Sequence, residues 1–268
     1  MPANLDDSYA GPSPLTFRPE AFFPVFERLP RKKEIVVCGD QAVNLLAALF
    51  LSQEELDGIL GEKGSATSAD MDIVISSELQ QWFDSSSGQK SRKFRLKRFP
   101  DARQPIRFAI LPDGMPDTRI DVLRNIRGID VKRDRVFEDA LEIDAPCRVM
   151  NPVTLLIAKA ENCGTLDQDT PTGRRNDLLH LRMLVPIVRN FFAEYLANCD
   201  PESKEDQRDI VNQLKKLGKA ATTNSFVRGF QTAGVRFLDA VPVTEIRGSS
   251  LDLLRRYLEN TFLCGLGE

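Results

Sequence analysis

The sequence is short of the residues from which several common kinds of site are built. It has a single histidine, His180, and its five cysteines are widely spaced, with none in a Cys-x-x-Cys arrangement. A lone histidine without partners cannot form a histidine-based metal site or a catalytic triad, so we expect His180 to pack between helices. The odd number and wide spacing of the cysteines argue against a disulfide framework and a zinc site. They indicate reduced thiols in a cytoplasmic protein.

Long apolar segments and several well-known motifs are also missing. The first 19 residues are polar and proline-rich, and the longest apolar run, residues 42–51, is too short to span a membrane. No Gly-x-Ser-x-Gly motif and no Walker-type Gly-Lys-Ser/Thr motif occurs. With 28% charged residues and a net charge of −3 in 268 residues, we expect a soluble protein with no membrane partner and no global attraction to nucleic acid.

Strand-like and helix-like patterns divide the chain near residue 150. We expect a mobile lead-in over residues 1–18, an α/β (α+β) domain over residues 19–150 and a helical domain over residues 151–268. The expected strands are residues 34–38, 70–76, 94–97, 106–111, 119–123 and 147–150. The expected helices are residues 41–50, 52–60, 77–83, 152–163, 174–198, 202–218, 222–239 and 249–263.

Three helix starts carry recognisable signals. Ser52 is followed three residues later by Glu55, which predicts a capping box. Ser77 is expected to cap the helix that follows it, and the pair Asn151–Pro152 combines a cap with proline at the first helical position.

Two carboxylates lie one residue apart in an otherwise apolar strand. Side chains two residues apart on a strand share a face, so Asp70 and Asp72 are expected to project together. Two like charges side by side are costly unless a cation lies between them. The alternative is structural, since most Asp-x-Asp pairs are exposed strand ends or helix caps.

A third acid supports the functional interpretation. Asp121 alternates with Ile120 and Val122 in a later strand, and it would join the pair if that strand lies beside the Asp70 strand. Three carboxylates can hold two Mg²⁺ ions, or Mn²⁺, which bind carboxylate oxygens and phosphate. One ion would activate a hydroxyl and the other would bind a triphosphate. We therefore predict Asp70, Asp72 and Asp121 as metal-binding and catalytic residues.

These segments resemble a known family. The turn at Gly39 after a strand, residues 67–73 and residues 120–122 look like the nucleotidyltransferase (polymerase-β-like) fold, a mixed sheet flanked by helices. Residues 151–160 and 174–181 resemble the helical half of the bacterial abortive-infection type nucleotidyltransferase toxins. Those proteins carry a lysine on one helix and an Arg-x-Lys-Asp-like stretch on the next.

The resemblance implies an activity and a set of residues. The activity is metal-dependent transfer of a nucleoside monophosphate from an NTP to a hydroxyl of RNA, notably tRNA, or of protein, in a toxin–antitoxin or phage-defence system with an antitoxin partner. Gly39 would let backbone N–H groups approach the phosphates, Lys159 would contact the triphosphate, and Asp177 would be a nearby supporting or catalytic acid. The implied nucleotide-binding residues are Gly39, Asp40, Thr67, Ser68, Lys159 and Asp177. The structural alternatives are an exposed helix lysine for Lys159 and a surface acid paired with Arg174 or Arg175 for Asp177.

Asp40 departs from the family pattern, in which Gly-Gly or Gly-Ser forms the turn. An acid at a helix start can cap the N–H of Ala42 or Val43, but it would repel a phosphate there. Either Asp40 turns away, or the phosphates bind elsewhere, or the site is impaired.

Residues 90–107 form a basic stretch, with Phe94 and Phe99 between eight lysines and arginines and only Asp101 opposing them. This stretch could guide an RNA acceptor toward the acidic residues. The alternative is an edge strand that its lysines and arginines protect against aggregation.

Three functional hypotheses follow from these observations. The first is the metal-dependent nucleotidyltransferase. The second is a related module that binds a nucleotide or a partner, with Asp40 blocking turnover. The third is a nucleic-acid-binding regulator that uses the basic stretch, whose binding would depend steeply on salt and would survive loss of Asp70.

Overall fold

The computed structural model describes residues 18–61, 70–85, 94–114, 118–170, 173–174 and 176–266. The predicted lead-in, apart from Arg18, lies outside these residues, as do Thr67, Ser68 and the first part of the basic stretch.

Within the described residues, seven strands form one mixed sheet in the order β3-β4-β5-β2-β1-β7-β6. Strand β2 is parallel to β5, and β1 is parallel to β7, while the other neighbours are antiparallel. The strands are β1 (Ile35–Cys38), β2 (Met71–Ile75), β3 (Phe94–Arg98), β4 (Ile106–Pro112), β5 (Ile120–Leu123), β6 (Leu141–Glu142) and β7 (Arg148–Val149). A mixed sheet flanked by helices is therefore confirmed, and the short strand β6 is an addition to the prediction.

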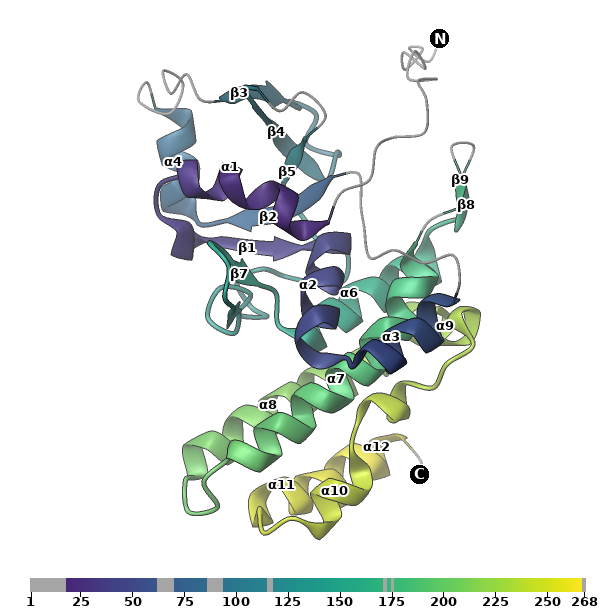
Figure 1. Ribbon diagram of the computed structural model, residues 1–268. Helices are drawn as coiled ribbons and strands as arrows, with labels where there is room; N and C mark the ends of the chain where they lie inside the picture. The colour runs from purple at the N-terminus through teal and green to yellow at the C-terminus, as the bar shows by residue number, and fades with distance from the viewer. Residues whose placement is uncertain are drawn as a thin grey trace.

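One face of the sheet is packed with apolar side chains. Helix α4 (Ser77–Asp84) lies on it, with the Phe83 ring 5.9 Å from that of Phe94 and 5.1 Å from that of Phe108. The N-terminal helices η1 (Pro19–Phe22) and α1 (Phe23–Arg28) and the turn η2 (Lys32–Glu34) precede β1. Figure 1 shows α1 and α4 on the same side of the sheet.

Helix α2 (Gly39–Phe50) follows β1 directly and contacts both the sheet and the helical part of the chain. It packs against β2 on one side and against α6 (Pro152–Thr165) and α7 (Asp177–Asn198) on the other. In Figure 1, α2 accordingly lies between the sheet and the long helices. Helix α3 (Gln53–Leu60) then packs against α7.

The helical part begins where the sheet ends, since β7 closes at Val149 and α6 opens at Pro152. Helix α8 (Lys204–Ala220) runs in the direction opposite to α7 (Figure 1) and packs against α6. The remaining elements are the hairpin β8 (Asp169–Thr170) and β9 (Gly173–Arg174), followed by α9 (Asn224–Ala233), η4 (Phe237–Ala240), α10 (Val243–Gly248), α11 (Asp252–Tyr257), the π-helix η5 (Leu258–Leu263) and α12 (Cys264–Leu266).

Two of the three predicted helix starts are confirmed. The Ser52 and Glu55 side chains form the reciprocal capping box, and Asn151 Oδ1 accepts from Val153 N at 3.0 Å. The cap of α4 was assigned to the wrong serine: Ser76 Oγ accepts from Leu79 N at 3.1 Å, and Ser77 is the first helical residue. Because both serines suit a cap, only the backbone turn decides between them.

Several predicted helices have different limits in the structure, and the one expected over residues 249–263 begins at Asp252 and continues as a π-helix from Leu258. The helix expected over residues 222–239 ends at Ala233, because Gly234 adopts a left-handed conformation with φ of 69° and closes it. The helix expected from residue 174 begins at Asp177, since residues 169–174 form the hairpin β8–β9.

The state of the cysteines and the length of the apolar helices can be compared with the structure. All five cysteines are free, and four of them are buried. Among the described residues, no helix is long and apolar enough to cross a membrane.

Glycine allows the closest approach between helices α6 and α9. A Cβ at Gly229 would overlap the carbonyl group of Ala160, whereas a Cβ at Gly58 in α3 would meet no atom within 4 Å. We expect Gly229→Ala to lower the free energy of unfolding by about 1–3 kcal/mol through overpacking. Gly58→Ala should raise it by up to about 1 kcal/mol, because alanine favours a helix. Urea denaturation of both variants measures this, and equal shifts would contradict the proposed close packing.

Candidate functional site

The predicted carboxylates lie next to each other on the second face of the sheet. Asp72 on β2 is directly opposite Asp121 on the parallel strand β5, so their side chains project from the same face. The Asp121 side chain is only 2% exposed, and Asp72 is partly buried. Asp70, which precedes β2, interacts electrostatically with both of them. The predicted pairing of these two strands is therefore present.

The row that contains the two aspartates crosses five strands. Cys38 on β1 pairs with Asp72, and Ala109 on β4 pairs with Asp121 and with Lys97 on β3. Lys97 therefore shares the face of the acids, and its charge lowers the pKa of Asp121, although burial raises that pKa overall. The row therefore begins with the buried residue Cys38 and ends with the exposed base Lys97.

Gly39 joins this row to the start of helix α2. Its φ of 67° is a conformation that favours glycine, and a Cβ at this position would overlap the Asp72 carboxylate. The first turn of α2 therefore closes directly onto Asp72. The N-terminus of a helix is electropositive, which suits a neighbouring carboxylate or phosphate.

Burial and mutual repulsion raise the free energy of the ionised carboxylates in the folded protein. Burial, followed by the charges of Asp70, Asp40 and Asp121, raises the pKa of Asp72 well above its usual range. An aspartate whose pKa is raised by folding destabilises the fold increasingly as the pH rises above its unfolded pKa of about 3.9. Uptake of a proton or binding of a cation would relieve this cost.

Arg119 supplies one such positive charge. Its Nε donates to Asp121 Oδ1 at 2.6 Å, and its guanidinium carbon lies 5.8 Å from the centre of the Phe99 ring. Lys97 Nζ lies 5.5 Å from the same ring. The sequence interpretation missed Arg119, although its position two residues before Asp121 places both on one face of a strand.

A second group of charges is buried behind the start of α2. Lys159 Nζ on α6 donates to Asp40 Oδ1 at 2.5 Å and to Asp177 Oδ1 on α7 at 2.8 Å. His180 Nδ1 lies 3.2 Å from the same Asp40 oxygen but is not aligned for a hydrogen bond. Burial alone would raise the pKa of Asp40, but Lys159 and His180 hold it below its usual range.

This ionic group decides between several alternatives left open by the sequence. Lys159 and Asp177 have side chains that are 5% and 3% exposed, so neither is a surface residue. Asp40 does not cap α2 as expected: it is the second residue of the helix, and its carboxylate turns toward Lys159. Lys159 is shared between Asp40 and Asp177, so it offsets only part of the negative charge at the start of α2. His180 is buried, as expected.

The described part of the basic stretch forms an edge strand. Strand β3 lies at the end of the sheet, as the structural alternative predicted. Arg98 pairs with Asp84 at 2.7 Å, and Arg103 pairs with Asp101 at 3.2 Å. Contact with nucleic acid therefore stays a prediction, and Lys97 is the member of the stretch that lies closest in register to the acids.

The acids are not organised as a complete metal centre. Among the described residues, no three histidine, cysteine, aspartate or glutamate side chains form a group that could hold a metal ion. The donor chemistry nevertheless fits Mg²⁺ or Mn²⁺, since carboxylate oxygens lie side by side and their ionised forms repel one another.

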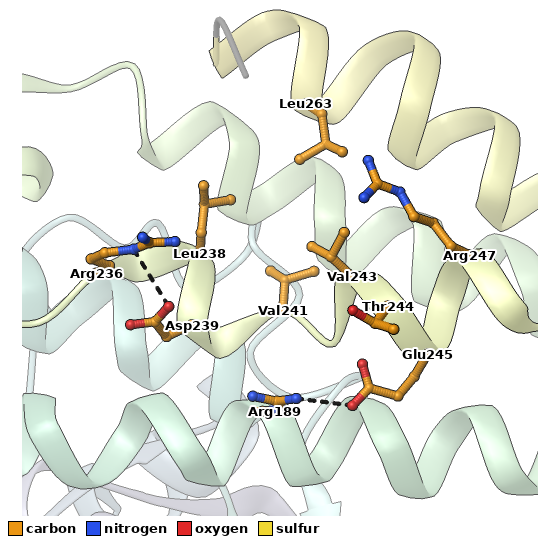
Figure 2. Close-up of a pocket in the computed structure, with 10 residues that line it drawn as sticks. All are labelled: Arg189, Arg236, Leu238, Asp239, Val241, Val243, Thr244, Glu245, Arg247 and Leu263. Atoms are coloured by element: carbon orange, nitrogen blue, oxygen red, sulfur yellow. Dashed lines mark hydrogen bonds and ion pairs between the residues drawn. The ribbon is translucent and has the colours of Figure 1, made fainter.

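A large pocket lies elsewhere in the molecule. It has a volume of about 340 Å³ and lies among η4, α10, α7 and the C-terminal helices. Figure 2 shows three arginines at its edges, and none of its lining residues is a predicted site residue. Pocket size alone would therefore not identify the acidic site.

Comparison with known proteins adds no assignment, because no family model, curated protein or solved structure matches this chain. The geometry of the site therefore carries the functional argument.

The contact between Gly39 and Asp72 can be tested by mutation. Both Gly39 and Gly234 have φ near 68°, so alanine at either costs about 1–2 kcal/mol in backbone strain. At Gly39 the added overlap with the Asp72 carboxylate should cost about 1–3 kcal/mol more, whereas Gly234 is open. We expect urea denaturation to show the larger loss for Gly39→Ala.

The matched control for this prediction is a double variant. In the Asp72→Ala background, Gly39→Ala should lose less stability than it does in the wild type, because the overlap with the carboxylate is gone and only a contact of 2.9 Å with the Cβ of residue 72 remains. Equal losses for the two single variants would contradict the contact.

Proposed function

We propose that this protein is a divalent-metal-dependent nucleotidyltransferase, which moves a nucleoside monophosphate from an NTP to an acceptor hydroxyl. The observation that carries the proposal is the in-register pairing of Asp72 with Asp121, beside the glycine start of a helix. The family resemblance of these segments supports the same reaction and points to RNA or protein as the acceptor. A polymerase-β-like fold is part of this proposal.

Each residue has a distinct role in the proposal. Asp70, Asp72 and Asp121 would hold Mg²⁺ or Mn²⁺, and the bound ion would supply Lewis-acid activation of a hydroxyl and neutralise phosphate charge. Backbone N–H groups in the first turn of α2 would face the phosphates, since Gly39 has no side chain to block them. Lys97 and Arg119 would bind the acceptor on the outer side of Asp121.

A second candidate rests on a specific observation. Lys159, which the resemblance assigns to the triphosphate, is held by Asp40 and Asp177 at 2.5 and 2.8 Å. A nucleotide would have to reach the site without that lysine or separate it from Asp40. If neither occurs, the protein is a nucleotide- or partner-binding module without turnover.

Label transfer distinguishes the two candidates. We expect label from one or more α-³²P NTPs to enter RNA or protein in the presence of Mg²⁺. Asp72→Asn should reduce this transfer by at least about a hundredfold, because it removes a carboxylate that holds the ion. The control Asp57→Asn removes an exposed acid from α3 and should leave transfer unchanged.

The result can exclude the enzyme proposal. Transfer that survives Asp72→Asn would contradict the metal-binding role of this residue. NTP binding without transfer in any reaction would favour the binding module.

A further inference from the structure

A second pocket, separate from the acidic site, lies where α2 and α7 end. Its volume is about 410 Å³, a size that suits a small molecule. Helix α2 contributes Leu49 and Phe50, and strand β6 contributes Glu142. The last two turns of α7 and the first turn of α8 complete the wall.

Aromatic rings form the apolar wall of this pocket. The rings of Phe50 and Phe191 meet edge to face at 5.9 Å, and those of Phe191 and Tyr195 at 6.1 Å. Leu49 is 54% exposed and adds an unusual apolar surface beside them. Aromatic faces attract organic cations, because the ring carries partial negative charge on its face.

The charged groups at this pocket have one sign. Glu142, Glu194 and Asp206 line it, and the pocket has no lysine, arginine or histidine among its described lining residues. Glu142 has a loose partner in Lys33, at 3.6 Å. Within the part of the chain that the structure describes, the side chains of Glu194 and Asp206 form no ion pair or hydrogen bond.

The pocket in Figure 2 provides a contrast within the same protein. Its three arginines each have a carboxylate partner: Arg189 pairs with Glu245 at 2.9 Å, Arg236 pairs with Asp239, and Arg247 pairs with Glu259. Two of these partners, Asp239 and Glu245, also line that pocket, whereas Glu259 lies outside its lining. In the aromatic pocket, the Glu194 and Asp206 side chains have no charged partner among the described residues, so a cation that enters the pocket would meet uncompensated negative charge.

The helix ends add to this negative potential. Helices α2 and α7 both end at the pocket, and neither has a basic residue in its last turn. The carboxyl end of a helix carries partial negative charge and favours a cation. Helix α8 begins there with one base, Lys204, and two acids, Glu205 and Asp206, in its first turn, so the side chains of that turn carry a net negative charge. Burial, and then the nearby acids, also raise the pKa of Tyr195.

We propose that this pocket binds a small organic cation with an apolar body, such as an alkylammonium or alkylguanidinium compound. The aromatic rings would hold the alkyl part and face the cationic head, while Glu194 and Asp206 would neutralise the charge. The proposal is independent of the nucleotidyltransferase proposal, because none of these residues belongs to the acidic site.

Three probes of equal length but different charge test the proposal. We would measure the Kd of n-hexylammonium, hexanol and hexanoate for the full chain by ligand-observed NMR titration. The cation should bind about tenfold more tightly than the alcohol, and hexanoate should bind more weakly than both. This order separates recognition of charge from simple burial of an alkyl chain.

Matched double variants then locate the binding. In Glu194→Gln/Asp206→Asn, the preference for hexylammonium over hexanol should fall to about twofold or less. In Glu27→Gln/Asp57→Asn, which removes two exposed acids from α1 and α3, the preference should be unchanged. Thermal unfolding of each variant checks that the fold is kept.

Three results would overturn the proposal. Equal affinity for hexanol and hexylammonium would show that the pocket is merely apolar. A preference that survives Glu194→Gln/Asp206→Asn would place the cation elsewhere. Absence of saturable hexylammonium binding would exclude the site altogether.

Discussion

The burial of Asp72 and Asp121 next to each other and beside Asp70 is the constraint around which the candidate site is arranged. Two neighbouring strands place these carboxylates in register on one face, where burial raises the pKa of both. Such a pair is a permanent cost to the fold unless positive charge compensates it. Arg119 supplies that charge on the outer side, and the first turn of α2 faces Asp72 on the inner side.

The same constraint links the sheet to the helical part of the protein. Asp40 follows Gly39, and its negative charge adds to burial and to Asp70 in raising the pKa of Asp72. Lys159 binds both Asp40 and Asp177, and His180 Nδ1 lies 3.2 Å from the Asp40 carboxylate. Part of the negative charge at the end of β1 is therefore offset by a lysine from a helix far along the chain.

Local patterns predicted the parts of the site that depend on neighbouring residues. The alternation of polar and apolar residues in the strands predicted that the acids share one face of the sheet. The glycine after β1 predicted that a helix starts directly after this strand. Arg119 could have been found by the same alternation. The pairing of Asp40 with Lys159 joins positions 119 residues apart, so no local pattern could reveal it.

The fold shows the same division between local and distant causes. The capping box at Ser52 depends on four consecutive residues and was predicted correctly. The end of α9 depends on the left-handed conformation of Gly234, a residue that a helical pattern also tolerates. The aromatic pocket arises where the ends of α2, α7 and β6 meet, which requires knowledge of the tertiary structure.

The most direct test of this account is the thermal unfolding of the wild type and Asp72→Asn, each with and without Mn²⁺. If the paired acids are built to hold a cation, Asp72→Asn should be at least as stable as the wild type without Mn²⁺. Adding Mn²⁺ should then raise the Tm of the wild type and leave that of the variant unchanged. Lower stability of Asp72→Asn without Mn²⁺, or equal stabilisation of both proteins by Mn²⁺, would contradict the account.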